Sequence, residues 1–523
     1  MERVAPRQIM YENQLPLAIE SKSQRRLFFP EGGSTYGPTG GGTNPNIIRI
    51  PINADSLLDV QHSYLQFKLN NLNVGGLAPD HGVPMIRRLR IESAGTTLED
   101  IDNYNKLYAG VLVPSQSSAG ALQESTITTA GQGDSEGVGL TSTLTAFTAA
   151  AAITHAAVNN PASADVAVLG TFGNAIGTAV TAAVNTALAG DIKTKLDART
   201  VGTAVNAGGF SGVGISTTTA KMARNTSVTY NVPLVSALFN MEKYLPLVMM
   251  NAGLTIEIEL DTAQAIGVCR NGSDAAGAGN VAPSWTVSDV RYVAHLIDLQ
   301  RDFYDRMRMV MEGSGGVLQL AGTTYRHYSG QTSDNAAETN VNIPSRIKSI
   351  KSVFFTQSKT ADITALTSMS TSNSVANGIS EYQFRVGSVV YPPTSIKVSP
   401  TNKGEAYSEL RKAWGNLGAY DGQSVLLNNS SYLTSFVDGG VASQPAGVGA
   451  VSQFNPFALD FESFQKIAAE NGINTADRSL PMSLELKHAN GTGSQSQAAV
   501  VDVFVMCDAI FYVNLDGSVS VSI

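Results

Sequence analysis

One order of sequence patterns occurs twice in this chain of 523 residues, and it limits the fold more than any other feature. Each copy has a strand ending in proline, two more strands, a helix with a capping signal, a loop, a strand introduced by Leu-Pro and a long β-branched run. The two Leu-Pro strands lie in residues 244–261 and 479–488, and both alternate apolar and polar residues with the period of a half-buried strand. The shared order predicts two units of one architecture.

The elements of the two copies can be matched one by one. The predicted strands of the first copy are 47–51, 64–69, 85–91, 227–232, 254–260 and 285–299. Their counterparts in the second copy are 341–344, 352–356, 382–391, 457–464, 482–486 and 498–515. A capping box at Thr96 and Glu99 predicts a helix over 98–111, and Asn402 with Glu405 predicts the matching helix.

Composition favours an all-β fold with more than one core. Charged residues make up only 15% of the chain and there are 49 glycines, which suits strands better than charged helical bundles. The length allows two cores of ordinary size. The predicted organisation is an N-terminal arm over 1–45, a first unit over 46–300, a linker helix over 301–315 and a second unit over 316–523, with regular structure beginning at Asn46. Phe303, Met307 and Val310, closed by Gly313, have the spacing of that linker helix.

The first unit contains a long insertion over residues 114–221. No Lys or Arg occurs between Lys106 and Lys193, and Ala, Thr, Gly, Ser and Val dominate. A connection of this length is rarely structureless in a compact domain, so we expect short strands or a helix around 175–188 on the outer face. A disordered low-complexity loop is the alternative.

Charge and cysteine content restrict the partners and the compartment. A formal net charge of −8 argues against wrapping nucleic acid over the whole surface, although the N-terminal region carries Arg3, Arg7, Lys22, Arg25 and Arg26. These are expected to form a solvated or interface arm, with nucleic-acid contact as the alternative. Cys269 and Cys507 are expected to be buried free thiols. No signal peptide or spanning helix is recognised, since polar residues interrupt the most apolar window, 173–190.

No constellation of residues predicts catalysis or a bound group. The six histidines are scattered without metal-ligand spacing, and no Gly-Lys dipeptide marks a phosphate-binding loop. Glu257, Glu259 and Asp261 share one face of a strand, where a solvated or intersubunit role is favoured over a glycosidase pair. His295 is expected in a core or an interface. The predicted catalytic, cofactor and metal residues are therefore none, and the chain is not expected to be an enzyme.

Four aromatic residues, Tyr325, Tyr328, Phe354 and Phe355, allow two interpretations. They could form a stacking platform for bases or sugars. Packing between two β-sheets is favoured.

Three segments together resemble major capsid proteins of the double jelly-roll lineage, which includes adenovirus hexon, large DNA viruses and virophages, and most of all the polinton-like and virophage proteins. The first joins Ile50-Pro51 with Leu58-Asp59-Val60-x-x-Ser63-Tyr64-Leu65. The second is Glu99-Asp100-Ile101-x-x-Tyr104-Asn105-x-Leu107, and the third is Leu245-Pro246 leading into 253–258. The resemblance extends over about residues 46–513, without the insertion.

The resemblance implies two tandem eight-stranded jelly rolls and a structural role in a virion. Three chains would form a pseudo-hexameric capsomer that tiles an icosahedral DNA-virus shell, with neighbouring capsomers and penton or minor capsid proteins as partners. The insertion would form an outward tower, and the N-terminal arm would lie underneath, against an inner membrane, a neighbour or the genome. The protein would be made in the host cytoplasm or nucleus and not secreted. The alternatives are a β-sandwich surface adhesin or glycan-binding protein, and a carbohydrate-active enzyme resting on Glu257 and Glu259.

Overall fold

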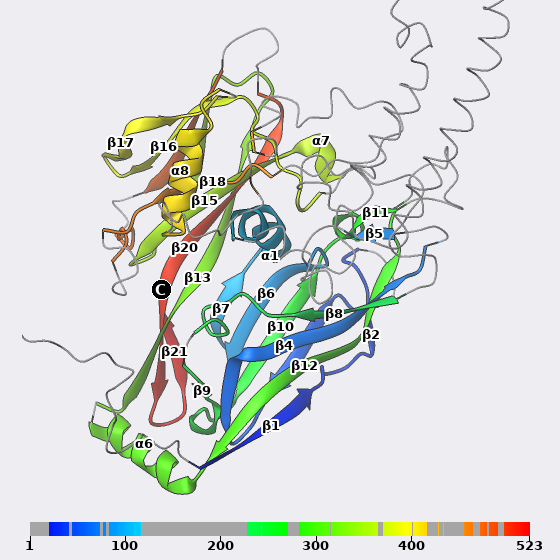
Figure 1. Cartoon of the computed structure of the whole chain (residues 1–523), viewed down its shortest axis with the longest axis vertical. Helices are drawn as coiled ribbons and strands as arrows, with labels where there is room; N and C mark the ends of the chain where they lie inside the picture. Colours follow the sequence, from blue (N-terminus) through cyan, green and yellow to red (C-terminus); the bar gives the residue numbers. More distant parts are fainter. Residues whose placement is uncertain are drawn as a thin grey trace, which may run out of the picture.

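The computed structural model shows a mostly β protein built from two units of matching topology, joined by one helix (Figure 1). It describes residues 20–40, 44–73, 77–79, 83–116, 227–241, 243–269, 282–313, 315–364, 370–399, 401–415, 427, 432–433, 454–463, 471–477, 481–489 and 496–523. The predicted insertion, with its helix around 175–188, lies outside the described residues except for 114–116.

Two antiparallel sheets form the first unit. Across the first sheet the order is β1 (Ser21–Phe28), β12 (Trp285–Leu299), β4 (Leu57–Asn71) and β8 (Ser227–Val232), with β2 (Thr35–Tyr36) beside β12 and β9 (Leu245–Pro246) beside β4. Across the second it is β3 (Ile47–Ile52), β10 (Leu254–Leu260), β6 (Ile86–Ser93) and β7 (Thr96–Ile101). Two short strands, β5 (Leu77–Pro79) and β11 (Gly267–Cys269), pair separately.

The second unit repeats this arrangement. Its first sheet has the order β13 (Val317–Thr332), β20 (Ala499–Asn514), β15 (Ile350–Lys359) and β18 (Phe457–Asp460), with β21 (Val519–Ser522) beside β20. Its second sheet has the order β14 (Glu338–Ile343), β19 (Met482–His488), β16 (Ile379–Val386) and β17 (Val389–Lys397). Each unit therefore contains eight principal strands in two four-strand sheets, which is the jelly-roll connectivity, and the predicted double jelly roll is confirmed.

The core of each roll lies between its two sheets. In β10 the residues Leu254, Ile256, Ile258 and Leu260 are buried and the intervening ones are only partly covered. β19 alternates in the same way. The two Leu-Pro strands of the sequence, β10 and β19, therefore occupy equivalent positions in the two rolls. A stacked aromatic pair also recurs at equivalent places. In the first roll the ring centroids of Phe67 on β4 and Tyr230 on β8 are 5.3 Å apart. In the second roll those of Phe355 on β15 and Phe457 on β18 are 4.9 Å apart.

Several predicted elements have the expected bounds. β8 and β12 cover 227–232 and 285–299, and α6 spans Arg301–Gly313. Helix α8 (Gly404–Ala413) follows Asn402, although its N-cap is Lys403 and no side chain caps it. β3 continues through Pro51 to Ile52, since proline is tolerated on an edge strand.

Two predicted elements are wrong. Residues 98–111 do not form one helix, because Thr96–Ile101 is strand β7 and the helical segment comprises α1 (Tyr104–Lys106), the π-helical turn η2 (Leu107–Leu112) and α2 (Val113–Gln116). Residues 382–391 are not one strand, since the chain turns at Gly387, with φ 59°, and forms the hairpin β16–β17. The remaining helices are short: η5 (Leu247–Met249), η6 (Ala263–Ile266) and α7 (Thr360–Ile363).

Regular structure begins before Asn46, so that prediction is also wrong. β1 and β2 lie within the residues assigned to an N-terminal arm, and β1 pairs along its whole length with β12. The first roll needs β1 as the counterpart of β13 in the second. The sequence missed β1 because Ser-Lys-Ser-Gln-Arg-Arg has no apolar alternation.

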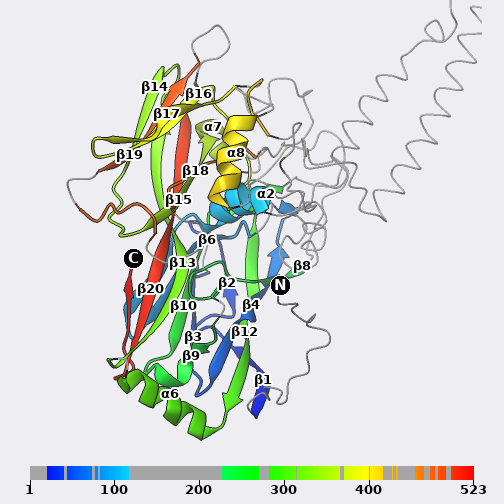
Figure 2. The same ribbon diagram turned by 60° about the vertical axis from the view of Figure 1, so that its left-hand side comes forward.

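The rolls lie against one another, and α6 crosses between them at the end of the molecule remote from α8 (Figures 1 and 2). The long strands β13 and β20 extend beside the first roll, where β13 and β21 pack against β7. Among the helices that the structure describes, none is long and apolar enough to cross a membrane.

Candidate functional site

The strand acids singled out in the sequence have separate surroundings. Glu257 faces outward from β10 and forms an ion pair of 2.6 Å with Arg49 on β3 and one of 3.4 Å with Arg90 on β6. Its counterpart Glu485 on β19 pairs with Arg385 at 2.5 Å, and this arginine holds the pKa of the Glu485 carboxyl below its ordinary value. The same Glu–Arg ion pair occurs at equivalent places on both rolls. This repetition indicates that the two glutamates stabilise the outer face of their sheets.

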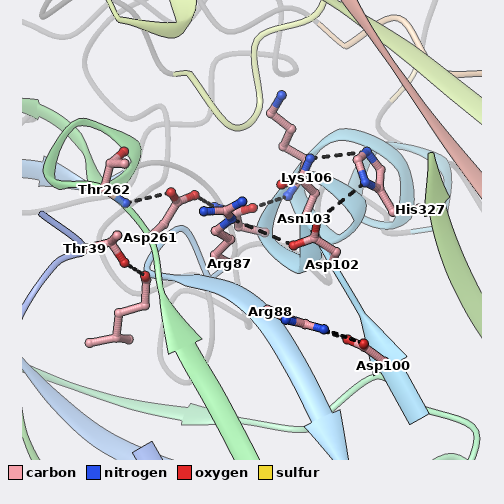
Figure 3. Close-up of polar contacts among 12 residues, drawn as sticks. Thr39, Arg87, Arg88, Asp100, Asp102, Asn103, Lys106, Asp261, Thr262 and His327 are labelled. Atoms are coloured by element: carbon pink, nitrogen blue, oxygen red, sulfur yellow. Dashed lines mark hydrogen bonds and ion pairs between the residues drawn. The ribbon is translucent and has the colours of Figure 1, made fainter. Parts of the chain in front are cut away.

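Asp261 and Glu259 do not join Glu257 in a catalytic pair. Asp261 lies beyond the end of β10 and accepts a hydrogen bond of 2.7 Å from the Asn105 side chain and one of 2.6 Å from the Thr262 N–H (Figure 3). Glu259 lines a separate cavity at the edge of the roll junction. Each carboxylate therefore belongs to a different local network.

Two buried carboxylates lie at the junction between the rolls, and the first is Glu99 of β7. Its carboxylate accepts hydrogen bonds from the Ala237 N–H at 2.7 Å, the Leu238 N–H at 3.3 Å and the Thr324 hydroxyl at 2.5 Å. Thr324 belongs to β13 of the second roll, so Glu99 joins the two rolls. Burial raises the pKa of Glu99, and these hydrogen bonds oppose the increase.

Glu99 thus has a role that the capping-box prediction did not foresee. Its side chain points into the junction and satisfies backbone donors of the connection that follows β8, rather than the start of a helix. The pattern Thr-x-x-Glu is compatible with either placement, because it contains no information on residues more than a hundred positions away.

A second junction contact centres on Asp502 of β20, whose side chain is 1% exposed. Lys106 of the first roll reaches it at 2.7 Å, and His327 Nε2 lies 2.9 Å from its other oxygen. Burial would raise the pKa of Asp502, but Lys106 and His327 lower it to about 2. Asn103 completes this contact with a hydrogen bond of 3.2 Å to Asp502.

A half-open cavity of about 390 Å³ lies beside these contacts. It is lined by Arg87, Arg88, Asp100, Asp102, Glu259, Arg326, His327 and Tyr328. Arg88 binds Asp100 with two hydrogen bonds of 2.7 and 2.6 Å (Figure 3). This pairing lowers the pKa of Asp100 against the opposing effect of burial. Acidic and basic groups are mixed, so the cavity has no single charge that would select an ion.

The aromatic residues pack in the protein and do not form a platform. Phe355 lies between the sheets of the second roll, with its ring centroid 5.3 Å from that of Tyr382 on β16. Phe354 is buried against helix α8 instead, where its ring stacks on Trp414 at 4.5 Å. Tyr325 is also buried, and Tyr328 is partly covered at the cavity. No exposed stacking surface forms from these residues.

Within the described part of the chain, no three His, Cys, Asp or Glu side chains gather as metal ligands would. His295 is partly buried, 6.3 Å from the ring of His62. Cys507 is a buried free thiol, and burial raises its pKa to about 12.

No protein-family model matches the chain, and neither does any curated protein sequence. Comparison with solved structures does find matches. The Vp54 protein of PBCV-1, fitted into a reconstruction of the virophage Sputnik, aligns over 98% of this chain and 99% of its own with a TM-score of 0.53 and 10% identity. A quasi-atomic model of the PBCV-1 virus capsid aligns over 98% and 99%, with a TM-score of 0.52 and 9% identity. The Faustovirus major capsid protein aligns over 96% and 92%, with a TM-score of 0.49 and 8% identity.

These alignments cover both rolls of the chain and nearly all of each solved structure. At identities near 10%, the structural alignments establish the fold but not the residues of a site. The chain therefore has the double jelly-roll fold that the PBCV-1 capsid structures share.

Proposed function

We propose that this chain is the major capsid protein of an icosahedral DNA virus and that three copies form a pseudo-hexameric capsomer. The observation that carries this proposal is the repeated topology within one chain, aligned over 98% of its length with viral capsid structures. Three chains of two similar rolls supply six similar units, which suits a ring with a hexagonal outline. The domains are a first roll ending near residue 300 and beginning at β1, a linker helix over 301–315 and a second roll over 316–523.

The junction between the rolls supports a structural role. Glu99, Lys106 and Asp502 link one roll to the other through hydrogen bonds and an ion pair that lie at least partly buried in the junction. A capsomer whose six units must meet neighbours at set angles needs such a fixed orientation. An enzyme would need a cleft with reactive groups, and the described cavity holds paired charges instead.

The proposed partners follow from the same role. Neighbouring capsomers and penton or minor capsid proteins would contact the trimer in the virion. The N-terminal region preceding β1 would contact an inner membrane or the genome, as its arginines suggest. The proposed location is the virion, after synthesis in the host cytoplasm or nucleus without secretion.

The decisive experiment is light scattering after size exclusion, combined with negative-stain electron microscopy of the purified full chain. The proposal expects three times the mass of one chain and particles with a hexagonal outline. A stable monomer would overturn it. Retention of that monomer on a glycan array would favour the rival function, a β-sandwich adhesin or glycan-binding protein.

A further inference from the structure

Strand β4 bulges where it runs beside the long strand β12 in the first roll (Figure 1). Val293 of β12 pairs with Tyr64, and His295 pairs with Asp59, so residues 60–63 of β4 lie opposite a single residue of β12. Bulges redirect side chains and are frequent beside functional sites. The side chain of His62, on this bulge, is 74% exposed.

The bulge places His62 beside His295, although the two residues are far apart in the sequence. Their ring centroids are 6.3 Å apart, and the ring planes are inclined by 61°. The His295 backbone N–H donates a hydrogen bond of 3.0 Å to the Ser63 hydroxyl, which ties the bulge to β12. Among the described residues, neither ring nitrogen of His295 has a hydrogen-bond partner. The His295 ring can therefore accept a ligand without losing a contact.

A buried carboxylate orients the ring of His62. Asp59 Oδ2 lies 2.7 Å from His62 Nδ1, and Asp59 Oδ1 accepts a hydrogen bond of 3.3 Å from the His62 backbone N–H. This contact favours the tautomer in which Nδ1 holds the proton and Nε2 keeps its lone pair. Metal-ligating histidines generally have such a carboxylate on the other ring nitrogen, because it fixes the ring and makes the ligating nitrogen more basic. His62 thus has the surroundings of a metal ligand.

The distance between the two rings suits one shared metal ion after a small movement. With Zn–N bonds of about 2.0 to 2.1 Å and a tetrahedral angle, two imidazoles on one zinc ion have centroids about 5 Å apart. The two rings would need to approach by about 1 Å from their observed separation. His62 can supply this movement because its side chain is largely exposed. Imidazole suits zinc, copper and nickel, whereas calcium and magnesium prefer oxygen ligands.

The charges beside the two rings are compatible with a bound cation. The Asp59 carboxylate is held against His62, whereas Arg25 of β1 is the register partner of His295. Arg25 is exposed, so its long side chain can keep the guanidinium in solvent away from the rings. The negative group is therefore fixed at the site, and the positive group can move away from it.

We propose that His62 and His295 together bind one divalent transition-metal ion, Zn²⁺ or Cu²⁺, with Asp59 positioning His62 and water completing the coordination. The ion would fasten the bulge of β4 to β12. Two protein ligands leave open positions on the metal, so the ion should exchange more readily than in a structural site with four protein ligands. This inference concerns a single chain and does not depend on the proposed capsomer.

Isothermal titration calorimetry of the untagged full-length chain with zinc chloride tests the site. Wild type should bind one zinc ion per chain, and His62→Gln and His295→Gln should each weaken binding at least tenfold. Asp59→Asn should weaken binding about tenfold, as loss of a carboxylate behind a ligating histidine does. Lys68→Gln is the matched control, because Lys68 lies on the same strand in an exposed ion pair with Asp289, and it should bind zinc as wild type does. Thermal unfolding without metal checks that each variant is folded.

Electron paramagnetic resonance with Cu²⁺ provides a second measurement. The wild-type spectrum should show coupling to two ligating nitrogens, and His295→Gln should show coupling to one. Calcium chloride should give no binding heat, since imidazole is not a ligand for this ion. Wild type that takes up no zinc, or histidine variants that bind zinc as tightly as wild type, would overturn the inference. Neither result alters the mass of the assembly, so the proposed function would stand.

Discussion

Lys106 of the first roll places its Nζ 2.7 Å from an oxygen of Asp502 in the second roll, and the Asp502 side chain is only 1% exposed. The two residues are 396 positions apart in the sequence. His327 lies against the other oxygen, so the carboxylate has two cationic or polar partners in a site almost closed to water. The pair joins the rolls at the end of helix α1.

Lys106→Met should lower the free energy of unfolding by about 2 to 3 kcal/mol, because it leaves a buried carboxylate with only part of its compensation. Urea denaturation of wild type and variant at one protein concentration measures the change. Lys487→Met is the control, since Lys487 pairs with Glu381 at 3.5 Å on an exposed surface and should cost less than about 1 kcal/mol. Equal losses in both variants would contradict a special role for the junction.

Asp502 should also contribute to the acid sensitivity of the protein. Its pKa in the folded chain is about 2, below the ordinary value near 3.9, so the unfolded chain takes up the proton first as the pH falls. The stability that the charged form supplies is complete above about pH 4 and is lost as the pH falls toward 2. Between pH 5 and pH 2, the free energy of unfolding of Asp502→Asn should therefore fall by about 2 kcal/mol less than that of wild type. Urea denaturation at a series of pH values across that range measures the difference. Parallel pH profiles for the two proteins would refute this assignment.

The sequence predicted the rolls well where one face of a strand is buried and the other is not. β10 and β19 alternate clearly, and β12 is long and β-branched, so local patterns were sufficient to find them. β1 was missed because its first six residues are exposed and do not alternate, although the strand pairs along its whole length with β12. The periodic pattern reports a buried face, and most of β1 has none.

The junction could not be predicted, for a different reason. Glu99 and Asp502 are charged residues in strands, and local rules place such residues at the surface or at a helix start. Their burial depends on Thr324, Lys106 and His327, which come from distant parts of the chain. Only the register between the rolls brings these groups together, and single-sequence patterns contain no information about that register.

Gly322 should be intolerant of a side chain because the rolls approach closely there. A Cβ at this position would lie 2.6 Å from the Ala237 carbonyl oxygen of the first roll. Gly322→Ala should destabilise the chain by about 1 to 3 kcal/mol through overpacking, measured by thermal or urea unfolding. Gly404→Ala at the start of α8 meets no atom within 4 Å and should be neutral or slightly stabilising. A Gly322→Ala variant as stable as wild type would show that the rolls can separate without cost.

Cys507 should be unreactive in the folded protein. The thiol is buried, and burial raises its pKa to about 12, so almost no thiolate forms near neutral pH. Iodoacetamide labelling followed by mass spectrometry should find Cys507 modified only after denaturation. Rapid labelling of the native protein at this residue would show that β13 and β20 open locally, since they cover the sulfur.

The buried and outward faces of strand β10 can be tested separately. Ile256 and Ile258 are 0% and 1% exposed and pack between the sheets, whereas Glu257 between them faces outward in ion pairs with Arg49 and Arg90. Replacing both isoleucines with Ala should cost several kcal/mol through cavity formation and abolish recovery of the folded assembly. Glu257→Gln should cost less than about 1 kcal/mol, because the pairs are partly exposed, and should leave assembly intact. Size exclusion measures assembly and urea unfolding measures stability for both variants. If Glu257→Gln fails to assemble, the outer face of β10 takes part in the contact between subunits.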